Sequence, residues 1–501
     1  MKSISHKDFL NFADQGYNRV PIIRQVLADL DTPLSVYMKL VNGPNSYLLE
    51  SVHGGEKFGR YSFIGLPAKK RIEVYEKNLK LIDKGELVES HNGDPLDYIK
   101  NFMGRFKVAP THEILPRFCG GLAGYFGYDT IRYIEPRLNS SNSSQKAAKP
   151  NVPDILLMLT EELVVFDNLT GNLFLIVYAD PTLKNSFIKG NERLDELLVS
   201  LSNTLITSDR KELISTEVVR HFPKENFLSA VLKAKEYIAE GDIMQVVIGQ
   251  SLTKAFDGCP LTLYRALRAI NPSPYMYYYD VGDFQVVGAS PEILVRQDWN
   301  KRDNKKSSKV TIRPIAGTRP RGKNEEEDRK NEEELKNDPK ECAEHVMLID
   351  LARNDIGRIA KSGSVRLTEK MIIERYSHVM HLVSEVEGLL MPDLSFMDVL
   401  RATFPAGTLS GAPKIRAMEI IDELEPIKRG LYGGACGYLS FSGEMDLAIT
   451  IRTGILKEGL LTVQAGAGIV ADSVPENEWL ESEQKAMAVL RAAEMVEKNM
   501  Q

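Results

Sequence analysis

The sequence predicts a mixed α/β (α+β) protein with more than one domain, and three observations support this. The chain has 501 residues, of which 43% are hydrophobic and 26% charged, a composition ordinary for soluble globular proteins. Short apolar runs bounded by turn residues predict many strands, as at 173–179. Helical periodicity predicts amphipathic helices at 95–106 and from residue 224 to a stop at 240–242.

The first 215 residues are expected to be rich in strands. Residues 20–40 predict a helix followed by a strand, with Asp31-Thr32-Pro33 as the turn between them. The other elements expected in this part are strands at 46–51, 61–65, 71–78, 79–85 and 153–180, a helix near 190–203 and a polar surface loop at 138–151.

A polar connector at 207–216 predicts a domain boundary, which divides the chain into residues 1–215 and 216–501. In the second part, residues 274–298 predict paired strands. Two charged stretches, at 300–309 and 322–340, predict a solvated loop and a solvated helix face.

Charge and cysteine content exclude several classes of function. A net charge of −6 does not indicate a nucleic-acid or membrane partner, so an anionic substrate would be held by a few local cations. The four cysteines are too widely separated for a disulfide scaffold or a zinc site, which favours reduced thiols in the cytoplasm. Neither a signal peptide nor a membrane-spanning run is recognisable.

A helix expected at 340–355 carries carboxylates where an apolar surface is predicted. Residues 346–352 are apolar except at one position, so the helix is expected to be buried nearly all round. Asp338 at the N-cap with Glu341 at the capping-box position explains one acid. Glu344 lies one turn further in, where capping does not explain it, and a buried carboxylate must be paired, protonated or bound to a cation.

A second acidic helix is expected at 473–496, with Ser473 and Glu476 as a capping box. Glu478, Glu481 and Lys485 lie along one stripe, which taken alone favours a solvated face. The positions available for burial are Leu480, Val489, Leu490 and Ala493. Two such helices with one inward Glu each would suit Mg²⁺, which takes few protein carboxylates and fills its octahedron with water and substrate oxygen.

Glycine-rich and cationic segments leave alternatives open. Residues 466–471 match the dinucleotide fingerprint without its structural context, so a strand end that lets a ligand approach backbone N–H groups is more plausible. Arginines at 313, 319 and 321 surround Gly317-Thr318 and indicate either an anion pocket or a surface turn. Arg452, in an apolar strand-like segment, needs a buried anionic partner.

Ten motifs occur together and in order over most of residues 220–497. They are NPSPYM, GASPE, PIAGTRPRG, KECAEHVMLIDLARND, RYSHVMHLVSEV, GTLSGAPK, YGGACGY, IRT, QAGAGIVADSVPENEW and ESEQKA. This set resembles the chorismate-utilising enzymes, specifically the component I family of anthranilate synthases. The resemblance implies an antiparallel β-sheet sandwich with surrounding helices and an interwoven N-terminal regulatory domain.

The resemblance also implies a reaction, in which ammonia adds to the ring of chorismate as the ring hydroxyl leaves and pyruvate is eliminated to give anthranilate. The implied Mg²⁺ ligands are Glu344 and Glu481, surrounded by Glu341, Glu478 and Gln245. The implied substrate-binding residues are Gly466, Ala467, Gly468 and Lys485 for the ring carboxylate, Tyr432 and Arg452 for the enolpyruvyl side, and Gly317 and Thr318. Glu292 and His381 resemble the acid–base groups, with Thr408 beside them.

Two positions discriminate between members of this family. Ala316 stands where aminodeoxychorismate synthases often carry a nucleophilic Lys, and Gln245 stands where isochorismate and salicylate synthases carry a Lys that activates water. Ammonia as the direct nucleophile remains. The alternatives are an aminodeoxychorismate synthase component I and, in a different class, a non-catalytic tryptophan sensor.

Regulation and an external ammonia source are implied as well. Leu48-Leu49-Glu50-Ser51 followed by Ser62 resembles the family's tryptophan-feedback site, which Asn271 and Pro274-Tyr275-Met276 would complete. The chain has no cysteine in a glycine-rich nucleophile elbow, so a separate glutamine amidotransferase subunit is expected to supply ammonia.

Overall fold

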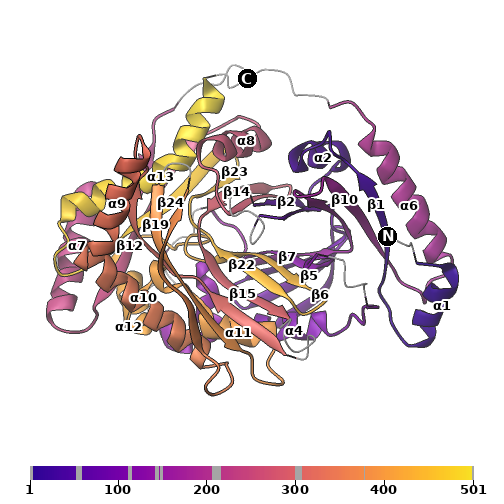
Figure 1. The fold of residues 1–501 in the computed structure, drawn as a ribbon, viewed down its shortest axis with the longest axis horizontal. Helices are drawn as coiled ribbons and strands as arrows, with labels where there is room; N and C mark the ends of the chain where they lie inside the picture. The colour runs from indigo at the N-terminus through magenta and orange to yellow at the C-terminus, as the bar shows by residue number, and fades with distance from the viewer. Residues whose placement is uncertain are drawn as a thin grey trace.

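Two large antiparallel sheets form the centre of the molecule in the computed structural model (Figure 1). The structure describes residues 4–51, 59–110, 116–140, 146, 150–205, 216–299, 307–376 and 379–498. The expected connector at 207–216 and the expected loops at 138–151 and 300–309 lie largely outside these residues.

The first sheet has the strand order β1-β10-β9-β3-β2-β13-β14-β23-β24-β12-β11, with β20 paired to β12. Its strands are β1 (Val20–Leu27), β2 (Ser46–Glu50), β3 (Tyr61–Gly65), β9 (Glu162–Asp167), β10 (Asn172–Ala179), β11 (Val219–Arg220), β12 (Gln245–Ala255), β13 (Tyr275–Asp280), β14 (Phe284–Ser290), β20 (Gly411–Ala412), β23 (Thr453–Lys457) and β24 (Leu460–Ile469).

The second sheet has the order β17-β19-β16-β15-β22-β21-β7-β8-β4-β5-β6, with β18 paired to β19. Its strands are β4 (Lys70–Tyr75), β5 (Asn78–Asp83), β6 (Glu86–Asn92), β7 (Gly121–Phe126), β8 (Ile155–Thr160), β15 (Ile293–Trp299), β16 (Ser308–Ile312), β17 (Ile315–Pro320), β18 (Arg366–Arg375), β19 (Val379–Leu389), β21 (Ala435–Ser440) and β22 (Met445–Ile449).

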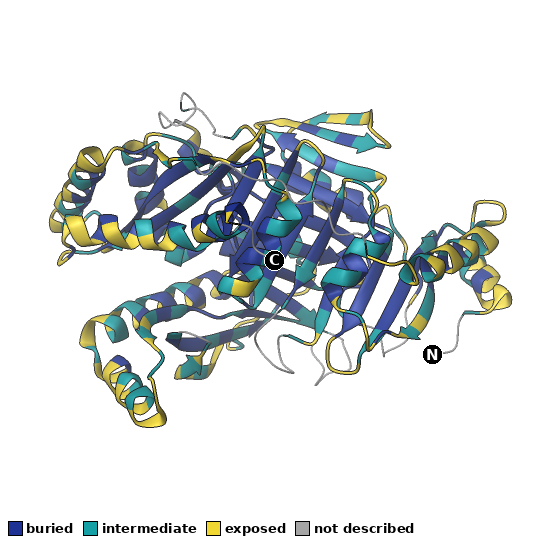
Figure 2. Cartoon of the chain, turned by 90° about the horizontal axis from the view of Figure 1, so that it is seen from above, coloured by how far each residue is buried: buried dark blue, intermediate teal, exposed yellow. Residues whose placement is uncertain are grey.

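Helices cover the outside of the sheets, and Figure 2 shows buried strands in the middle with helices exposing their outer faces. The helices are α1 (His6–Asp14), α2 (Pro33–Leu40), α4 (Pro95–Met103), α5 (Ile131–Ile134), α6 (Ser186–Leu201), α7 (Lys224–Ala239), α8 (Pro260–Ile270), α9 (Glu325–Asn337), α10 (Pro339–Gly357), α11 (Phe396–Thr403), α12 (Lys414–Leu424) and α13 (Pro475–Glu497), with short 3₁₀ turns such as η5 (Gly407–Leu409).

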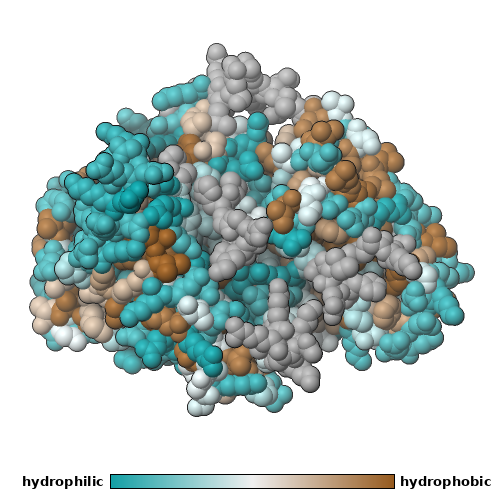
Figure 3. All heavy atoms as spheres, in the orientation of Figure 1, coloured by the Kyte–Doolittle hydropathy of each residue, from teal (hydrophilic) through white to brown (hydrophobic). Residues whose placement is uncertain are grey.

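A shared core holds the sandwich together. Large side chains from the first sheet, such as Tyr47 and Phe63, pack with Tyr125 and Met158 of the second. The prediction of an antiparallel sandwich with surrounding helices is therefore confirmed. Figure 3 shows mostly hydrophilic side chains on one face of the molecule. Among the described residues, no helix is both long and apolar enough to cross a membrane.

The two halves of the chain are interwoven at the level of strand pairing. In the first sheet β2 pairs with β13, and in the second β7 pairs with β21. Each sheet thus contains strands from both sides of the expected boundary at 215/216, and the division of the chain into two domains at that point stays a prediction.

The prediction for residues 20–40 was wrong in order, because the strand β1 comes first and the helix α2 follows. Val20–Leu27 carries β-branched residues that pair with β10 along the whole strand. Thr32, taken as part of a turn, is instead the N-cap of α2, and its hydroxyl accepts the N–H of Ser35. Pro33 occupies the first helical turn, where its missing N–H has no cost.

Two details of the acidic helices also differ from expectation. Asp338 caps α10 as predicted, but the helix is buried on one side only, since Val346 is 46% exposed and Asp350 is exposed. Helix α13 has Val474 rather than Ser473 at its N-cap, because the Ser473 hydroxyl accepts the N–H of Val470 instead. Leu480 is exposed and not buried.

Candidate active site

The residues to which the resemblance assigns catalysis and substrate binding converge where the β12–β24 end of the first sheet meets β17, β19, α10 and α13. Contacts between these elements link α10 to β17 and β19, α13 to β24, and η5 to β12 and β24. The site is therefore built entirely from residues after 216, on rigid strands and helices.

Glu292 is a buried carboxyl group between β14 and β15. The hydroxyl of Thr408 donates to both of its oxygens, at 3.2 and 3.3 Å. Burial raises the pKa of Glu292 to about 8, although Thr408, the Ile315 N–H, Arg452 and Lys485 all act to lower it. The group is therefore mostly protonated at neutral pH and can donate a proton.

His381 faces the same site from β19 in the neutral form. Its Nδ1 lies 2.8 Å from the Gly317 carbonyl oxygen and 3.1 Å from the Thr318 hydroxyl. A carbonyl oxygen only accepts, so Nδ1 carries the hydrogen and Nε2 keeps its lone pair. Burial lowers the pKa of His381, which favours this neutral state. His381 is thus suited to accept a proton at Nε2.

Gly317 has a conformational reason to be glycine. It lies at a register shift of β17 with φ +62°, and a Cβ there would lie 2.8 Å from Leu335 Cδ1. Only glycine adopts this geometry without strain. The resulting irregularity aims the Gly317 carbonyl at His381 and fixes its tautomer.

Arg452 lies at the junction of β22 and β23, with φ +50°, rather than inside a strand. Burial lowers the pKa of its guanidinium group, and Glu292 and Tyr376 are the acidic neighbours whose ionised forms would oppose this. Its Nη1 lies 3.5 Å from Asn271 Oδ1, and within the described ranges it forms no ion pair. The anionic partner expected for this cation is therefore not a carboxylate of the described chain.

The glycines of β24 make room for an aromatic ring. Gly466 pairs directly with Gly249 of β12, and Cβ atoms at these positions would lie 2.9 Å from the Tyr432 hydroxyl and 3.1 Å from its ring. Lys485 donates to the Gly466 carbonyl at 3.1 Å. Gly466, Ala467 and Gly468 thus form the end of a strand beside Tyr432, and the next helix begins only at Pro475, unlike a dinucleotide-binding turn.

Glu344 of α10 and Glu481 of α13 belong to one acidic cluster. Burial raises the pKa of Glu344, and the charges of Glu341 and Glu481 act in the same direction. The Gln245 side chain donates a hydrogen bond to Glu344, while its own Oε1 is buried and has no hydrogen-bond partner among the described residues. Burial also raises the pKa of Glu478, with Glu481 adding to the shift. These carboxylates repel one another.

Such a donor set fits a magnesium ion. In the part of the chain that the structure describes, no group of three or more His, Cys, Asp or Glu is placed to hold a metal. Mg²⁺ needs only one or two protein carboxylates, and a dication between Glu344 and Glu481 would relieve their repulsion. The expectation that Glu481 points inward was wrong, since its side chain is 49% exposed and forms an ion pair with Lys485 at 2.7 Å.

The three arginines near Gly317 do not form an anion pocket, because each is paired with protein carboxylates. Their partners are Glu369, Glu374 and Glu385 for Arg313, Glu334, Asp338 and Glu341 for Arg319, and Asp328 for Arg321. These arginines instead tie β17 to β18, β19, α9 and α10, so their contribution to the site is structural.

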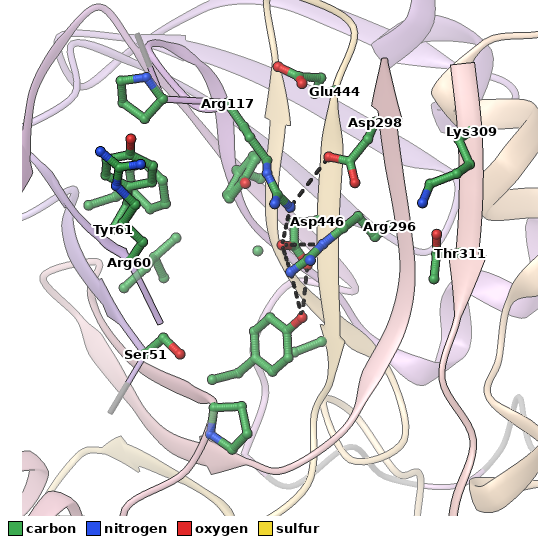
Figure 4. Close-up of a pocket in the computed structure, with 18 of the residues that line it drawn as sticks. Ser51, Arg60, Tyr61, Arg117, Arg296, Asp298, Lys309, Thr311, Glu444 and Asp446 are labelled. Carbon is green, nitrogen blue, oxygen red and sulfur yellow. Dashed lines mark hydrogen bonds and ion pairs between the residues drawn. The ribbon is translucent and has the colours of Figure 1, made fainter. Parts of the chain in front are cut away.

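A separate cavity of about 1090 Å³ lies between the two sheets (Figure 4). Six of the nine residues of the resemblance's tryptophan site line it, namely Leu49, Glu50, Ser51, Pro274, Tyr275 and Met276. The other three do not: Leu48 is buried, Ser62 is buried and receives a hydrogen bond from Asn168, and Asn271 points to Arg452.

The opposite wall of this cavity was missed at the sequence level. Arg296 of β15 pairs with Asp446 of β22 at 2.7 Å, and the Tyr275 hydroxyl donates to the same carboxylate at 3.1 Å. Figure 4 also shows Arg117 reaching Asp298 and Asp446. Charged residues in apolar strand segments, the signal that singled out Arg452, would have found Arg296 and Asp446.

Comparisons with known proteins agree with this geometry. Residues 45–491 match the family model described as chorismate binding enzyme. Anthranilate synthase component 1 of Neisseria meningitidis serogroup A is 54% identical over 497 residues, which are 99% of each chain. The same component of Aquifex aeolicus is 46% identical over 493 residues, which are 97% of each chain.

Solved structures show the same fold. Anthranilate synthase component I from Streptococcus pneumoniae TIGR4 superposes with a TM-score of 0.74 at 37% identity, covering 93% of this chain and 98% of the other. The menaquinone-specific isochorismate synthase MenF of Escherichia coli shares the fold alone, with a TM-score of 0.69 at 19% identity over 97% and 98% of the chains. The chain therefore belongs to the chorismate-binding enzymes, and within them to the anthranilate synthase component 1 family.

Proposed function

We propose that this chain converts chorismate and ammonia to anthranilate, pyruvate and water, as the first committed amination toward tryptophan. One observation carries the proposal: the protonated carboxyl group of Glu292, the neutral imidazole of His381 and the guanidinium group of Arg452 face one another, and the guanidinium group has no ion-pair partner among the described residues. This arrangement suits a dianionic substrate that must lose a hydroxyl group and then a ring proton.

Binding uses the two cationic ends of the site. Arg452, which lacks a carboxylate partner in the described chain, takes the enolpyruvyl carboxylate together with Tyr432. Lys485 and the backbone of Gly466–Gly468 face the ring carboxylate. The magnesium ion that we propose at Glu344 and Glu481 would supply Lewis acidity toward that carboxylate. The two carboxylates together fix the ring between Glu292 and His381.

Two proton movements follow from the protonation states. Glu292 gives its proton to the ring hydroxyl, which departs as water while ammonia bonds to the ring. His381 Nε2 accepts the ring proton as the bond from the ring to the enolpyruvyl oxygen breaks and the ring becomes aromatic, and the enolpyruvate that leaves takes up a proton to become pyruvate. The single O–H of Thr408, which lies 3.2 and 3.3 Å from the two oxygens, donates to the Glu292 carboxylate left by the first transfer.

The identity of the nucleophile follows from two side chains. Ala316, next to Gly317, is buried and offers no amine to attack the ring. Gln245 is held against Glu344 and, as an amide, cannot deprotonate water. Ammonia therefore attacks directly, and we propose that a glutamine amidotransferase subunit delivers it. All four cysteines are free thiols, which agrees with our proposal of a cytoplasmic protein.

The first test is product identification. Incubated with chorismate, Mg²⁺ and ammonium chloride, the purified chain is expected to form anthranilate, detected by its blue fluorescence, and to be inert with glutamine alone. Formation of 4-aminobenzoate after addition of a lyase would instead identify an aminodeoxychorismate synthase, and absence of any product would favour a sensor. Glutamine-dependent turnover by the pure chain would refute the proposed separate amidotransferase.

We further propose that tryptophan binds in the cavity between the sheets and inhibits the enzyme. The cavity wall is continuous with the active site, since Tyr275 and Met276 of β13 pair with Ser290 and Ala289 of β14, just before Glu292. The Ala289 N–H also donates to the Arg452 carbonyl. A ligand that favours one arrangement of these strands can thereby change the catalytic residues.

Ser51→Ala tests this site. Losing one hydrogen bond to a charged amino acid costs about 1.5–3 kcal/mol, so the tryptophan concentration for half inhibition should rise about tenfold or more, at nearly unchanged kcat. The control is Ser200→Ala in α6, whose hydroxyl donates to the Glu196 carbonyl of the same helix, and it should leave inhibition as in the wild type. Equal sensitivity of the Ser51 variant and the control would place the effector elsewhere.

A further inference from the structure

A buried ion pair outside the residues assigned so far lies directly behind the active site. Glu425 and Arg429 are 6% and 3% exposed and pair at 2.6 Å. Resting on the proposed function, we propose that Arg429, held by Glu425, is a positioning residue that fixes Thr408, Tyr432 and strand β12 relative to one another.

The first contact runs to the segment that carries Thr408. Arg429 Nη1 donates to the carbonyl oxygen of Leu409 at 2.6 Å. Leu409 is the residue after Thr408 in η5, and the Thr408 hydroxyl is hydrogen-bonded to Glu292. A shift of the Leu409 carbonyl would therefore also shift the Thr408 hydroxyl, which is hydrogen-bonded to the proton donor Glu292.

The second set of contacts runs to β12. Arg429 Nη2 donates to the Val247 carbonyl at 2.8 Å, and the Gly249 N–H donates to Glu425 Oε1 at 2.7 Å. These residues pair with Gly468 and Gly466, which we assign to the ring carboxylate. The ion pair therefore fixes β12, and through its pairing with β24 it fixes the position of Gly466 and Gly468.

The third contact is with Tyr432. The Arg429 guanidinium carbon lies 5.3 Å from the centre of the Tyr432 ring, and the Tyr432 N–H donates to the Arg429 carbonyl at 3.2 Å. A guanidinium over an aromatic face is attractive and orients the ring. Arg429 thus contacts the segment that carries Thr408, the strand that pairs with Gly466 and Gly468, and Tyr432 on the enolpyruvyl side.

The chemistry of the pair supports a role beyond stability. Burying two charges costs solvation, and well-packed apolar residues in place of such a pair are often neutral or stabilising. The guanidinium satisfies its donors on two different segments through a planar fork, which an ammonium group cannot reproduce. Geometry, not charge alone, is what Arg429 supplies.

Arg429→Lys tests the proposal, because it keeps the charge beside Glu425 and removes the fork. With ammonia expressed as free base, kcat/KM for chorismate should fall about tenfold to a hundredfold, as expected for a small misplacement of catalytic groups. Thr408 lowers the pKa of Glu292, so its displacement lets Glu292 keep its proton to higher pH, and the alkaline limb of kcat should move upward.

The pH profile separates positioning from stability. The other titratable groups around Glu292 are Arg452, Lys485, Tyr376 and His381, and these stay unchanged. Thr408→Val should move the limb in the same direction, and the double variant no further than Thr408→Val alone. The control Arg19→Lys makes the same chemical change at a partly buried arginine that pairs with Glu161 and Asp180, far from Arg429 and from the active site, and its limb should match the wild type.

Coincident limbs for Arg429→Lys and wild type, or a double variant that shifts by the sum of the two, would overturn the proposal. Should Arg429→Lys fail to fold, Glu425→Gln is the second variant, because it keeps the shape of the side chain and the oxygen that accepts the Gly249 N–H. Its alkaline limb of kcat must also move to higher pH, by a smaller amount. A wild-type chain that forms no anthranilate would instead refute the proposed function itself.

Discussion

Glu292→Gln is expected to lower kcat for anthranilate formation by about 10²–10⁴-fold, the range that a positioned acid contributes. Glutamine keeps the shape of the side chain and can still accept from the Thr408 hydroxyl, but it cannot give a proton to the departing ring hydroxyl. In the wild type, activity should fall as pH rises through about 8, where the Glu292 carboxyl group loses its proton. The alkaline limb should be absent from the residual activity of the variant.

Thermal unfolding supplies the control for this variant. The pKa of Glu292 in the folded state lies above its ordinary value of 4.5, so its contribution to stability is complete below that value and is lost as pH rises through about 8. Glu292→Gln should therefore have a higher Tm than the wild type at pH 7–8, with a gap that narrows toward pH 4. Loss of activity together with a lower Tm at pH 8 would indicate misfolding and contradict the assigned role.

Glu344→Gln and Glu481→Gln are expected to abolish magnesium-dependent turnover while leaving the fold intact. Mutating a residue that only hydrogen-bonds to a metal ligand lowers metal affinity about 10–100-fold. Loss of a ligand itself should therefore raise the magnesium concentration needed for half-maximal activity at least about 100-fold. Removing either charge also removes the repulsion that a dication would relieve. Magnesium titrations of activity and of Tm, both with chorismate present, measure the effect.

The matched control for these variants is Glu476→Gln, an exposed carboxylate in the first turn of α13. It makes the same change on the same helix, away from the cluster with Glu344. Its magnesium dependence should equal that of the wild type. Full activity of either cluster variant at wild-type magnesium concentrations would contradict the metal assignment.

Local chemistry made some features predictable. Asp338 before Pro339 predicted the start of α10, since a side-chain acceptor followed by proline is a strong helix-initiating pattern. The same reasoning was wrong for Ser473, because its hydroxyl bonds backward to Val470 rather than forward into α13. A cap prediction assumes a backbone direction that only the folded chain decides.

Long-range features were beyond reach from local patterns. Gly249 opposite Gly466 leaves the space for Tyr432, but this register joins residues more than 200 positions apart. The carboxylate partners of Arg313 likewise come from two other strands, β18 and β19, so an anion pocket and a structural ion pair looked alike in the sequence. Only the resemblance gathered the site residues, because their roles depend on contacts that no spacing reveals.

The interwoven sheets have a consequence for synthesis of the chain. Strand β2 ends at residue 50, but its partner β13 is synthesised much later. The first sheet is continuous only once β24, which lies between β23 and β12 and ends at residue 469, has also been made. At ribosomal rates of about 5–20 residues per second, this interval lasts roughly 20–80 s. Unpaired strand edges template association with other chains. We therefore expect the nascent protein to depend on chaperones until its last strands have emerged.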